Sequence, residues 1–125
     1  MELLLDTNVL LWWLDDSSEL NDDARSAIAE PENLVYVSAV SVWEIVIKKS
    51  LGKLVMPRKW LQTLSEESFR RLTVSWDHAL AVEKLPDLHR DPFDRLLIAQ
   101  AQTDGLTLVT SDSTVCKYRV KTLKN

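Results

Sequence analysis

Four acidic residues stand where the chain is expected to leave buried segments: Asp6, Glu44, Asp94 and Asp112. Asp6 and Asp112 each follow a short apolar run typical of a buried strand, and Glu44 and Asp94 fall in the first two turns of expected helices. Because the carboxyl ends of parallel strands meet at one edge of a sheet, we expect the four side chains to project toward that edge.

Carboxylates crowded together repel one another unless cations neutralise them. Oxygen ligands without cysteine or clustered histidine favour Mg²⁺ or Mn²⁺ over zinc. Ions held in this way can activate water and stabilise charge during phosphodiester cleavage, in two-metal sites with the ions about 3.5–4 Å apart. We therefore expect Asp6, Glu44, Asp94 and Asp112 to hold such a cation together.

Each acid also has a structural interpretation. Asp94 in a first helical turn would stabilise the helix N-terminus, and Glu44 precedes Lys48 by four residues, the spacing of a surface ion pair. Asp6 and Asp112 could be capping or turn residues. One shared site explains all four positions more economically than four coincidences.

The other reactive residues fit structural roles better. Asp91 precedes Pro92 and is expected to cap a helix. His78 and His89 lie far from any nucleophile pattern, so neither a Ser-His-Asp site nor a histidine-ligated metal is expected. The lone Cys116 cannot form an internal disulfide, which suits a reducing compartment.

Composition bounds the class of protein. The 125 residues, 46% hydrophobic and 27% charged, predict a single domain over 1–125. Only two glycines are present, Gly52 and Gly105, too few and too far apart for a P-loop or a dinucleotide fingerprint. The N-terminus is neither a signal peptide nor a membrane span, so we expect a cytoplasmic protein without membrane contacts.

The net charge of −4 conceals a strong asymmetry. Residues 1–44 hold ten acids and one base, net −9, whereas residues 45–125 hold nine acids and fourteen bases, net +5. Whole-chain charge is therefore a poor guide to any local surface. Candidates for phosphate contact are the basic residues Lys48, Lys49, Lys53, Arg58, Lys59, Arg90 and Arg95.

Strands and helices are expected to alternate along the chain. Expected strands cover residues 3–5, 34–37, 72–74 and 106–110, with a short fifth near 120–123. Expected helices cover residues 9–14, 21–28, 39–51, 57–64, 75–85 and 92–104. The pattern predicts an α/β fold, a three-layer α/β/α sandwich with a central, mostly parallel sheet.

Four stretches, in this order, carry a resemblance to a known family. They are LLDTNVLL at 4–11, SVWEI at 41–45 continuing through Lys48 to Gly52-Lys53-Leu54, HRDPFDRLLIAQA at 89–101, and LVTSD at 108–112. Together they span nearly the whole chain. The chain resembles PIN-domain ribonucleases, and among these the VapC-type toxins of bacterial type II toxin–antitoxin systems.

The resemblance implies a PIN-like fold and a Mg²⁺- or Mn²⁺-dependent endoribonuclease, usually dimeric and inhibited by a cognate antitoxin. By position, Asp6, Glu44, Asp94 and Asp112 match the acidic quartet, with Asn8 and Thr110 as supporting polar residues. We expect cleavage of RNA by metal-activated water, without a covalent enzyme intermediate.

Three alternatives stay open. The chain could be a PIN-like nuclease of RNA processing outside a toxin system, or a PIN-like module that only binds RNA or protein. A haloacid dehalogenase-like phosphatase also places an aspartate after its first strand, but it needs a second aspartate two residues later, where this chain has Asn8.

Overall fold

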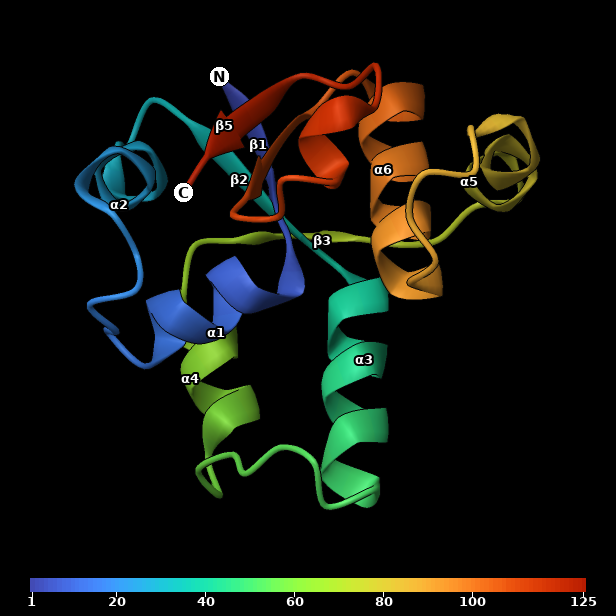
Figure 1. The fold of residues 1–125 in the computed structure, drawn as a ribbon. Coiled ribbons are helices and arrows are strands. Elements are labelled where there is room, and N and C mark those ends of the chain that lie inside the picture. The colour runs from blue at the N-terminus through green and yellow to red at the C-terminus, as the bar shows by residue number, and fades with distance from the viewer.

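Five parallel strands form the centre of the molecule, in a computed structural model that describes all residues 1–125 (Figure 1). The strand order is β3-β2-β1-β4-β5, and every neighbouring pair is parallel. The strands are β1 (Glu2–Leu5), β2 (Leu34–Ser38), β3 (Arg70–Leu72), β4 (Thr107–Thr110) and β5 (Thr122–Lys124).

Six α-helices connect and cover the strands. They are α1 (Thr7–Leu14), α2 (Asp22–Ala29), α3 (Ala39–Ser50), α4 (Trp60–Glu66), α5 (Trp76–Ala81) and α6 (Pro92–Asp104), with 3₁₀ turns η1 (Val82–Lys84) and η2 (Val115–Lys117). The predicted caps are confirmed: the side chains of Asn21, Ser38, Ser75 and Asp91 accept backbone hydrogen bonds at the starts of α2, α3, α5 and α6. No helix is long and apolar enough to span a membrane.

Several element boundaries differ from the prediction: the first helix begins at Thr7 rather than at residue 9, and the fifth strand begins at Thr122 rather than near residue 120. The third strand covers 70–72 rather than 72–74, because β2 runs only to Ser38 and Leu72 is the residue that pairs with it. Pro57 does not begin α4; its carbonyl accepts from the Trp60 N–H in a preceding turn. The helix after Ser75 ends at Ala81 and continues as the single turn η1.

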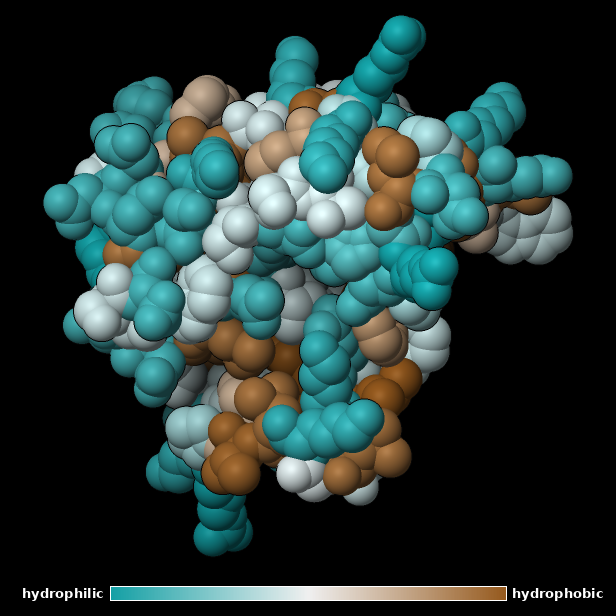
Figure 2. Space-filling view, in the orientation of Figure 1, coloured by the Kyte–Doolittle hydropathy of each residue, from teal (hydrophilic) through white to brown (hydrophobic).

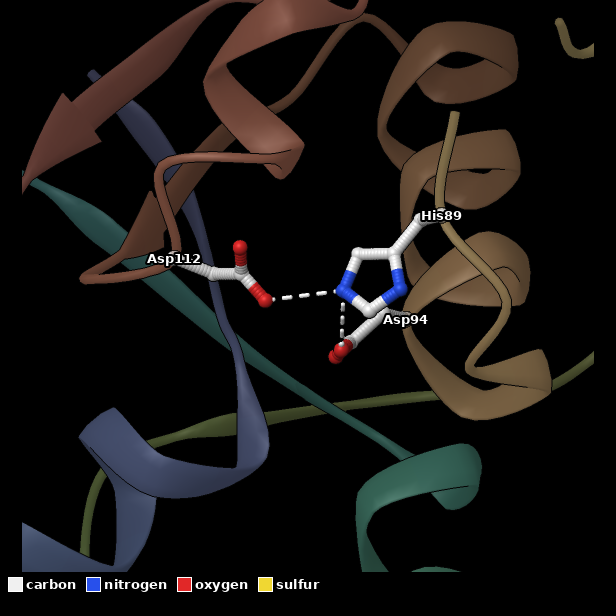
Figure 3. Close-up of side chains that lie close together, drawn as sticks. All are labelled: His89, Asp94 and Asp112. Atoms are coloured by element: carbon white, nitrogen blue, oxygen red, sulfur yellow. Dashed lines mark hydrogen bonds and ion pairs between the residues drawn. The ribbon is translucent and has the colours of Figure 1, made fainter. Parts of the chain in front are cut away.

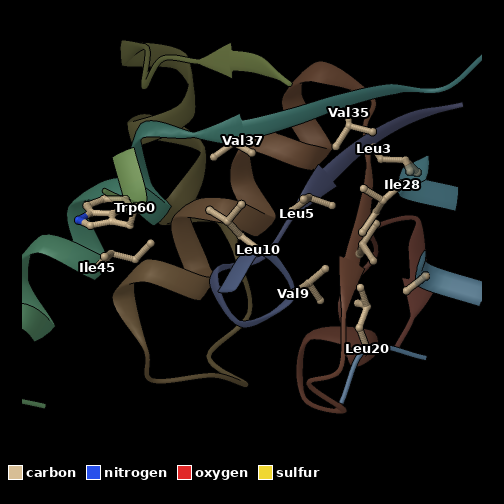
Figure 4. Close-up of a cluster of buried hydrophobic side chains, with 12 residues drawn as sticks. Leu3, Leu5, Val9, Leu10, Leu20, Ile28, Val35, Val37, Ile45 and Trp60 are labelled. Atoms are coloured by element: carbon tan, nitrogen blue, oxygen red, sulfur yellow. The ribbon is translucent and has the colours of Figure 1, made fainter. Parts of the chain in front are cut away.

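Successive side chains of β1 point alternately into two separate hydrophobic clusters. Leu3 and Leu5 face one cluster that includes Leu10 of α1 and Trp60 of α4, shown in Figure 4. Leu4 faces a second cluster, built largely from α6 and β4. The sheet is thus covered on both faces, which confirms the three-layer α/β/α fold.

The carboxyl ends of the three central strands lead into the functional candidates. Strand β1 runs directly into Asp6 and α1, β2 runs into α3, and β4 ends two residues before Asp112. Parallel pairing brings these three ends to the same edge of the sheet.

Candidate functional site

Asp6 is held rigidly at the junction of β1 and α1. It is the N-cap of α1, and its Oδ1 accepts a 2.8 Å hydrogen bond from the Val9 N–H. Its backbone N–H donates to the Val109 carbonyl of β4, which ties the residue to the sheet. Only 6% of Asp6 is exposed, so a buried carboxylate stands at the sheet edge.

Glu44 reaches the same region from the second turn of α3 and is 5% exposed. Its Oε1 accepts a 2.8 Å hydrogen bond from the Thr7 hydroxyl, and its Oε2 lies 2.5 Å from Nζ of Lys48. Thr7 Oγ1 also lies 3.0 Å from the buried Ser41 hydroxyl. Nothing in the sequence marks the role of Thr7, because only the packing of α1 against α3 brings it to Glu44, whereas Ser41 lies one turn before Glu44 on α3 itself.

Asp94 and Asp112 approach each other across an imidazole (Figure 3). Asp94 lies in the first turn of α6, and Asp112 follows β4. His89 Nε2 lies 3.0 Å from Asp94 Oδ2 and 2.8 Å from Asp112 Oδ2. The three side chains come from three separate segments and converge on one point.

The placement of His89 corrects the sequence analysis, which gave this residue no part in the site. His89, Asp94 and Asp112 together form a group with metal-ligand spacing, their donor atoms within 4.8 Å of one another. A usable signal was its position two residues before the Asp91 cap, which places it beside the first turn of α6. The predicted cap role of Asp91 is confirmed by its hydrogen bonds from the Phe93 and Asp94 N–H groups.

Burial and mutual repulsion shift the pKa values of two of the acids. Desolvation raises the pKa of Asp6 to about 6, and the charges of Asp112 and Glu44 add to the increase, while hydrogen bonds from Thr110 and Val9 oppose it. Desolvation also raises the pKa of Asp94 to about 7, supported by the charges of Asp91, Asp6 and Glu44. Asp6 therefore lies within electrostatic reach of each of the other three acids.

The pKa of Asp112 shifts in the opposite direction. Burial alone would raise its pKa, but the hydrogen bond from His89 and those from the Thr114 and Val115 N–H groups lower it overall. The hydrogen bond between Lys48 and Glu44 raises the pKa of the Lys48 ammonium group, and the charges of nearby acids add to the increase. A cation already compensates Glu44, whereas Asp6 and Asp94 have no basic side chain paired with them except the His89 imidazole at Asp94.

The two predicted supporting residues differ in placement. Thr110 is fully buried and its hydroxyl accepts from the Asp112 N–H at 3.0 Å, while its hydrogen bond with Asp6 lowers the pKa of that acid. Asn8 is exposed, and no hydrogen bond joins its side chain to the acids. Thr110 thus connects two of the four acids, and Asn8 does not.

The basic candidates fall into two groups. Three are occupied within the protein: Lys48 pairs with Glu44, Lys49 lies 5.8 Å from the Trp60 ring, and the Arg95 guanidinium donates to the Val82, Pro86 and His89 carbonyls. The others are exposed side chains: Lys53, Arg58, Lys59 and Arg90.

The donor set fits a hard divalent cation. It consists of carboxylate oxygens, with no cysteine, and the acids that lack compensation are those whose pKa values burial raises most. Asp94 Oδ1 accepts no hydrogen bond from the protein, so this oxygen is free to bind a cation.

The chain is similar in sequence to a known family and to a ribonuclease. The PIN domain family model matches residues 3–121. Ribonuclease VapC22 of Mycobacterium tuberculosis is 32% identical over 121 residues, covering 94% of this chain and 92% of that protein.

Two solved structures have the same fold. One is VapBC2 from Rickettsia felis bound to a DNA fragment from its promoter, with a TM-score of 0.75, 15% identity and coverage of 99% of this chain and 98% of that one. The other is DNA-bound VapBC from Salmonella typhimurium, with a TM-score of 0.71, 13% identity and coverage of 99% and 98%. With a family model over nearly the whole chain, a relative above 30% identity and a matching fold, the chain belongs to the PIN-domain family.

Proposed function

We propose that the protein is a metal-dependent endoribonuclease, which holds Mg²⁺ or Mn²⁺ with Asp6 and Asp94 and completes the site with Glu44 and Asp112. The observation that carries the proposal is that the chain leads four acids to one edge of the sheet, where burial and neighbouring charges raise the pKa values of Asp6 and Asp94. Keeping the buried Asp6 and the half-buried Asp94 close to other acids costs free energy, and a bound cation would remove that cost.

The chain's own residues do the positioning. Asp6 is fixed by the Val9 N–H, Glu44 by Thr7 and Lys48, and Asp112 by the Thr114 N–H. These hydrogen bonds leave little freedom for the carboxylates to move when charge develops on a substrate. A divalent cation held there would lower the pKa of a water molecule and stabilise charge on a phosphodiester.

RNA as substrate is supported by the ribonuclease name of the relative with 32% identity. Exposed basic side chains, among them Lys53 and Arg90, offer phosphate contacts on an otherwise acidic chain. The site contains no serine or cysteine nucleophile paired with a base, which supports attack by water rather than a covalent intermediate.

The test is cleavage of a labelled RNA by purified protein with Mg²⁺ or Mn²⁺, with and without a chelator. We expect the chelator to abolish cleavage and Asp94→Asn to lower it about 100-fold or more. Asp22→Asn on exposed α2 is the matched control and should cleave normally. Full activity of Asp94→Asn, with no metal requirement, would refute the assignment.

A toxin role with an antitoxin partner is the favoured biological context. One structural neighbour, at 18% identity, is a member of the VapBC family of toxin–antitoxin systems from Mycobacterium tuberculosis. The surface supports protein partners, an antitoxin or a second copy: a groove of about 490 Å³ along α3 and α4 is mostly apolar, and Trp43, Val46 and Leu61 in it are exposed. Figure 2 shows hydrophobic side chains gathered over the lower part of the molecule, where α1, α3 and α4 lie in Figure 1.

The context is testable by co-expression with the product of the neighbouring open reading frame. A toxin should form a complex of defined stoichiometry with that product and lose ribonuclease activity in it. Size-exclusion chromatography with light scattering would give the mass of the free protein and of the complex. Unaltered activity and no complex would favour a PIN-like nuclease outside a toxin system.

A further inference from the structure

A buried tyrosine outside the acidic cluster is hydrogen-bonded to the loop that carries His89. Tyr118 follows η2 and is 5% exposed. Its hydroxyl oxygen accepts from the His89 N–H at 2.7 Å and from the Leu88 N–H at 3.2 Å. A tyrosine oxygen that accepts two consecutive backbone N–H groups fixes the course of the loop at that point.

Arg95 holds the same loop from the other side. It is the residue after Asp94 on α6, and its guanidinium donates to the carbonyls of Pro86 at 3.0 Å and His89 at 3.4 Å. One of its nitrogens also lies 3.3 Å from the Tyr118 hydroxyl. The backbone of His89 is thus bonded at its N–H by Tyr118 and at its carbonyl by Arg95.

The imidazole is oriented as firmly as its backbone. The Asp91 N–H donates to His89 Nδ1 at 3.1 Å. Because a backbone N–H can only donate, Nδ1 is the acceptor and the ring proton lies on Nε2. That Nε2–H donates to Asp112 Oδ2 at 2.8 Å, and Asp94 Oδ2 lies 3.0 Å from the same nitrogen.

These contacts close a ring of bonded segments. Asp112 Oδ1 accepts from the Thr114 N–H where η2 is about to begin, η2 leads to Tyr118, Tyr118 holds His89, and His89 returns to Asp112 Oδ2. No other side chain joins Asp112 to Asp94. The relative placement of these two acids therefore depends on where His89 sits.

We propose that His89 is a positioning residue whose Nε2–H sets the placement of Asp94 against Asp112, and that Tyr118 keeps it there. The inference rests on the proposed metal site for its functional meaning. It assigns His89 as a hydrogen-bond donor to Asp112 that also contacts Asp94, and not as a metal ligand. Ligation through Nε2 would require the ring proton to move to Nδ1 and would break the bond from the Asp91 N–H.

Tyr118→Phe is the decisive variant, because Tyr118 touches neither carboxylate and only its hydroxyl is removed. Tyr36→Phe is the matched control: Tyr36 is the only other tyrosine, it is half-buried on β2, and its hydroxyl makes no hydrogen bond in the structure. His89→Gln keeps an N–H donor of similar reach, whereas His89→Ala removes it.

The first measurement is Mn²⁺ affinity, by electron paramagnetic resonance titration without RNA. We expect Tyr118→Phe and His89→Ala to weaken binding about 10-fold, and His89→Gln and Tyr36→Phe to stay within about threefold of the original protein. Equal losses in His89→Gln and His89→Ala would overturn the donor assignment and favour ligation.

The second measurement is NMR of the metal-free protein. In Tyr118→Phe we expect faster hydrogen exchange at the His89 amide and shifted carboxyl ¹³C resonances of Asp94 and Asp112, with neither change in Tyr36→Phe. Unshifted carboxyl resonances in Tyr118→Phe would overturn the positioning role. If the original protein binds no Mn²⁺ while these resonances do shift, the metal site fails and the positioning role stands.

Discussion

The Thr7 hydroxyl donates a 2.8 Å hydrogen bond to Oε1 of Glu44 and so joins the first turn of α1 to the second turn of α3. Both residues are buried, with 4% and 5% exposure. Since α1 starts where β1 ends and α3 starts where β2 ends, this one bond fixes the spacing of two site elements at the sheet edge.

Replacing Thr7 with valine keeps the shape and removes the hydroxyl. Glu44 then loses a donor in a buried site, and we expect the free energy of unfolding to fall by about 1–3 kcal/mol. Urea unfolding measures this directly. Thr103→Val, on the exposed surface of α6, should change stability by less than about 0.5 kcal/mol; similar losses in both variants would show that the Glu44 contact has no special weight.

Asp6→Asn should separate stability from activity. Asparagine caps a helix about as well as aspartate, so the bond from the Val9 N–H survives, and the charge that burial disfavours disappears. We expect the metal-free variant to be about 1–3 kcal/mol more stable than the original protein near neutral pH, while RNA cleavage is lost. Asp23→Asn, in the exposed first turn of α2, provides the comparison. A destabilised Asp6→Asn protein would show that Asp6 is a structural acid.

The raised pKa values also determine a pH dependence. In the metal-free fold, Asp6 and Asp94 keep their protons up to about pH 6 and 7, whereas the unfolded chain releases them near its ordinary value of 3.8. The folded state thus binds more protons in this window, and the contribution of these groups to stability falls as the pH rises from about 4 to about 7. The lowered pKa of Asp112 acts in the opposite direction, below that window.

Cations should reverse this trend, because they bind the ionised carboxylates. We expect Mg²⁺ to stabilise the protein little near pH 5 and strongly near pH 8, as measured by thermal unfolding with and without the ion. Ca²⁺, which is larger and accepts looser geometry, serves as a comparison ion. Stabilisation by Mg²⁺ that does not change with pH would mean that the ion binds elsewhere.

The sequence alone predicts the parts of this structure that have a periodic apolar pattern or a capping residue at their start. Leu3-Leu4-Leu5 predicted a buried strand, and Asp91-Pro92 predicted the start of α6, because apolar runs and capping residues act locally. The predicted position of the third strand was two residues too late in the chain. β3 is a short edge strand, and its position follows from pairing with β2 rather than from its own residues.

The supporting contacts of the site could not be predicted in the same way. His89 and Tyr118 are 29 residues apart, and they meet only because η2 folds back beside the loop before α6. Arg95 has the sequence context of a phosphate contact, yet its guanidinium holds loop carbonyls. Such contacts depend on irregular segments, where spacing along the chain does not predict which side chains meet. The acidic quartet itself stays a prediction that the experiments above test.

The exposed Arg90 provides the last prediction, on RNA binding. It lies between His89 and the Asp91 cap, beside the acidic cluster, and no ion pair or hydrogen bond engages its side chain. If it contacts phosphate, each RNA complex releases about one counterion through it, so Arg90→Gln should lower affinity for RNA of any sequence and reduce the slope of log affinity against log salt by about 1. Filter binding in an Asp94→Asn background prevents cleavage during the titration.

Arg25→Gln is the control, since Arg25 is paired with Asp16 at 2.6 Å on α2. It should leave the salt slope unchanged. If Arg90→Gln also leaves the slope unchanged, the RNA backbone does not pass over the loop before α6, and the phosphate contacts would have to come from the other exposed bases, Lys53, Arg58 and Lys59, at the far end of α3 and the turn before α4.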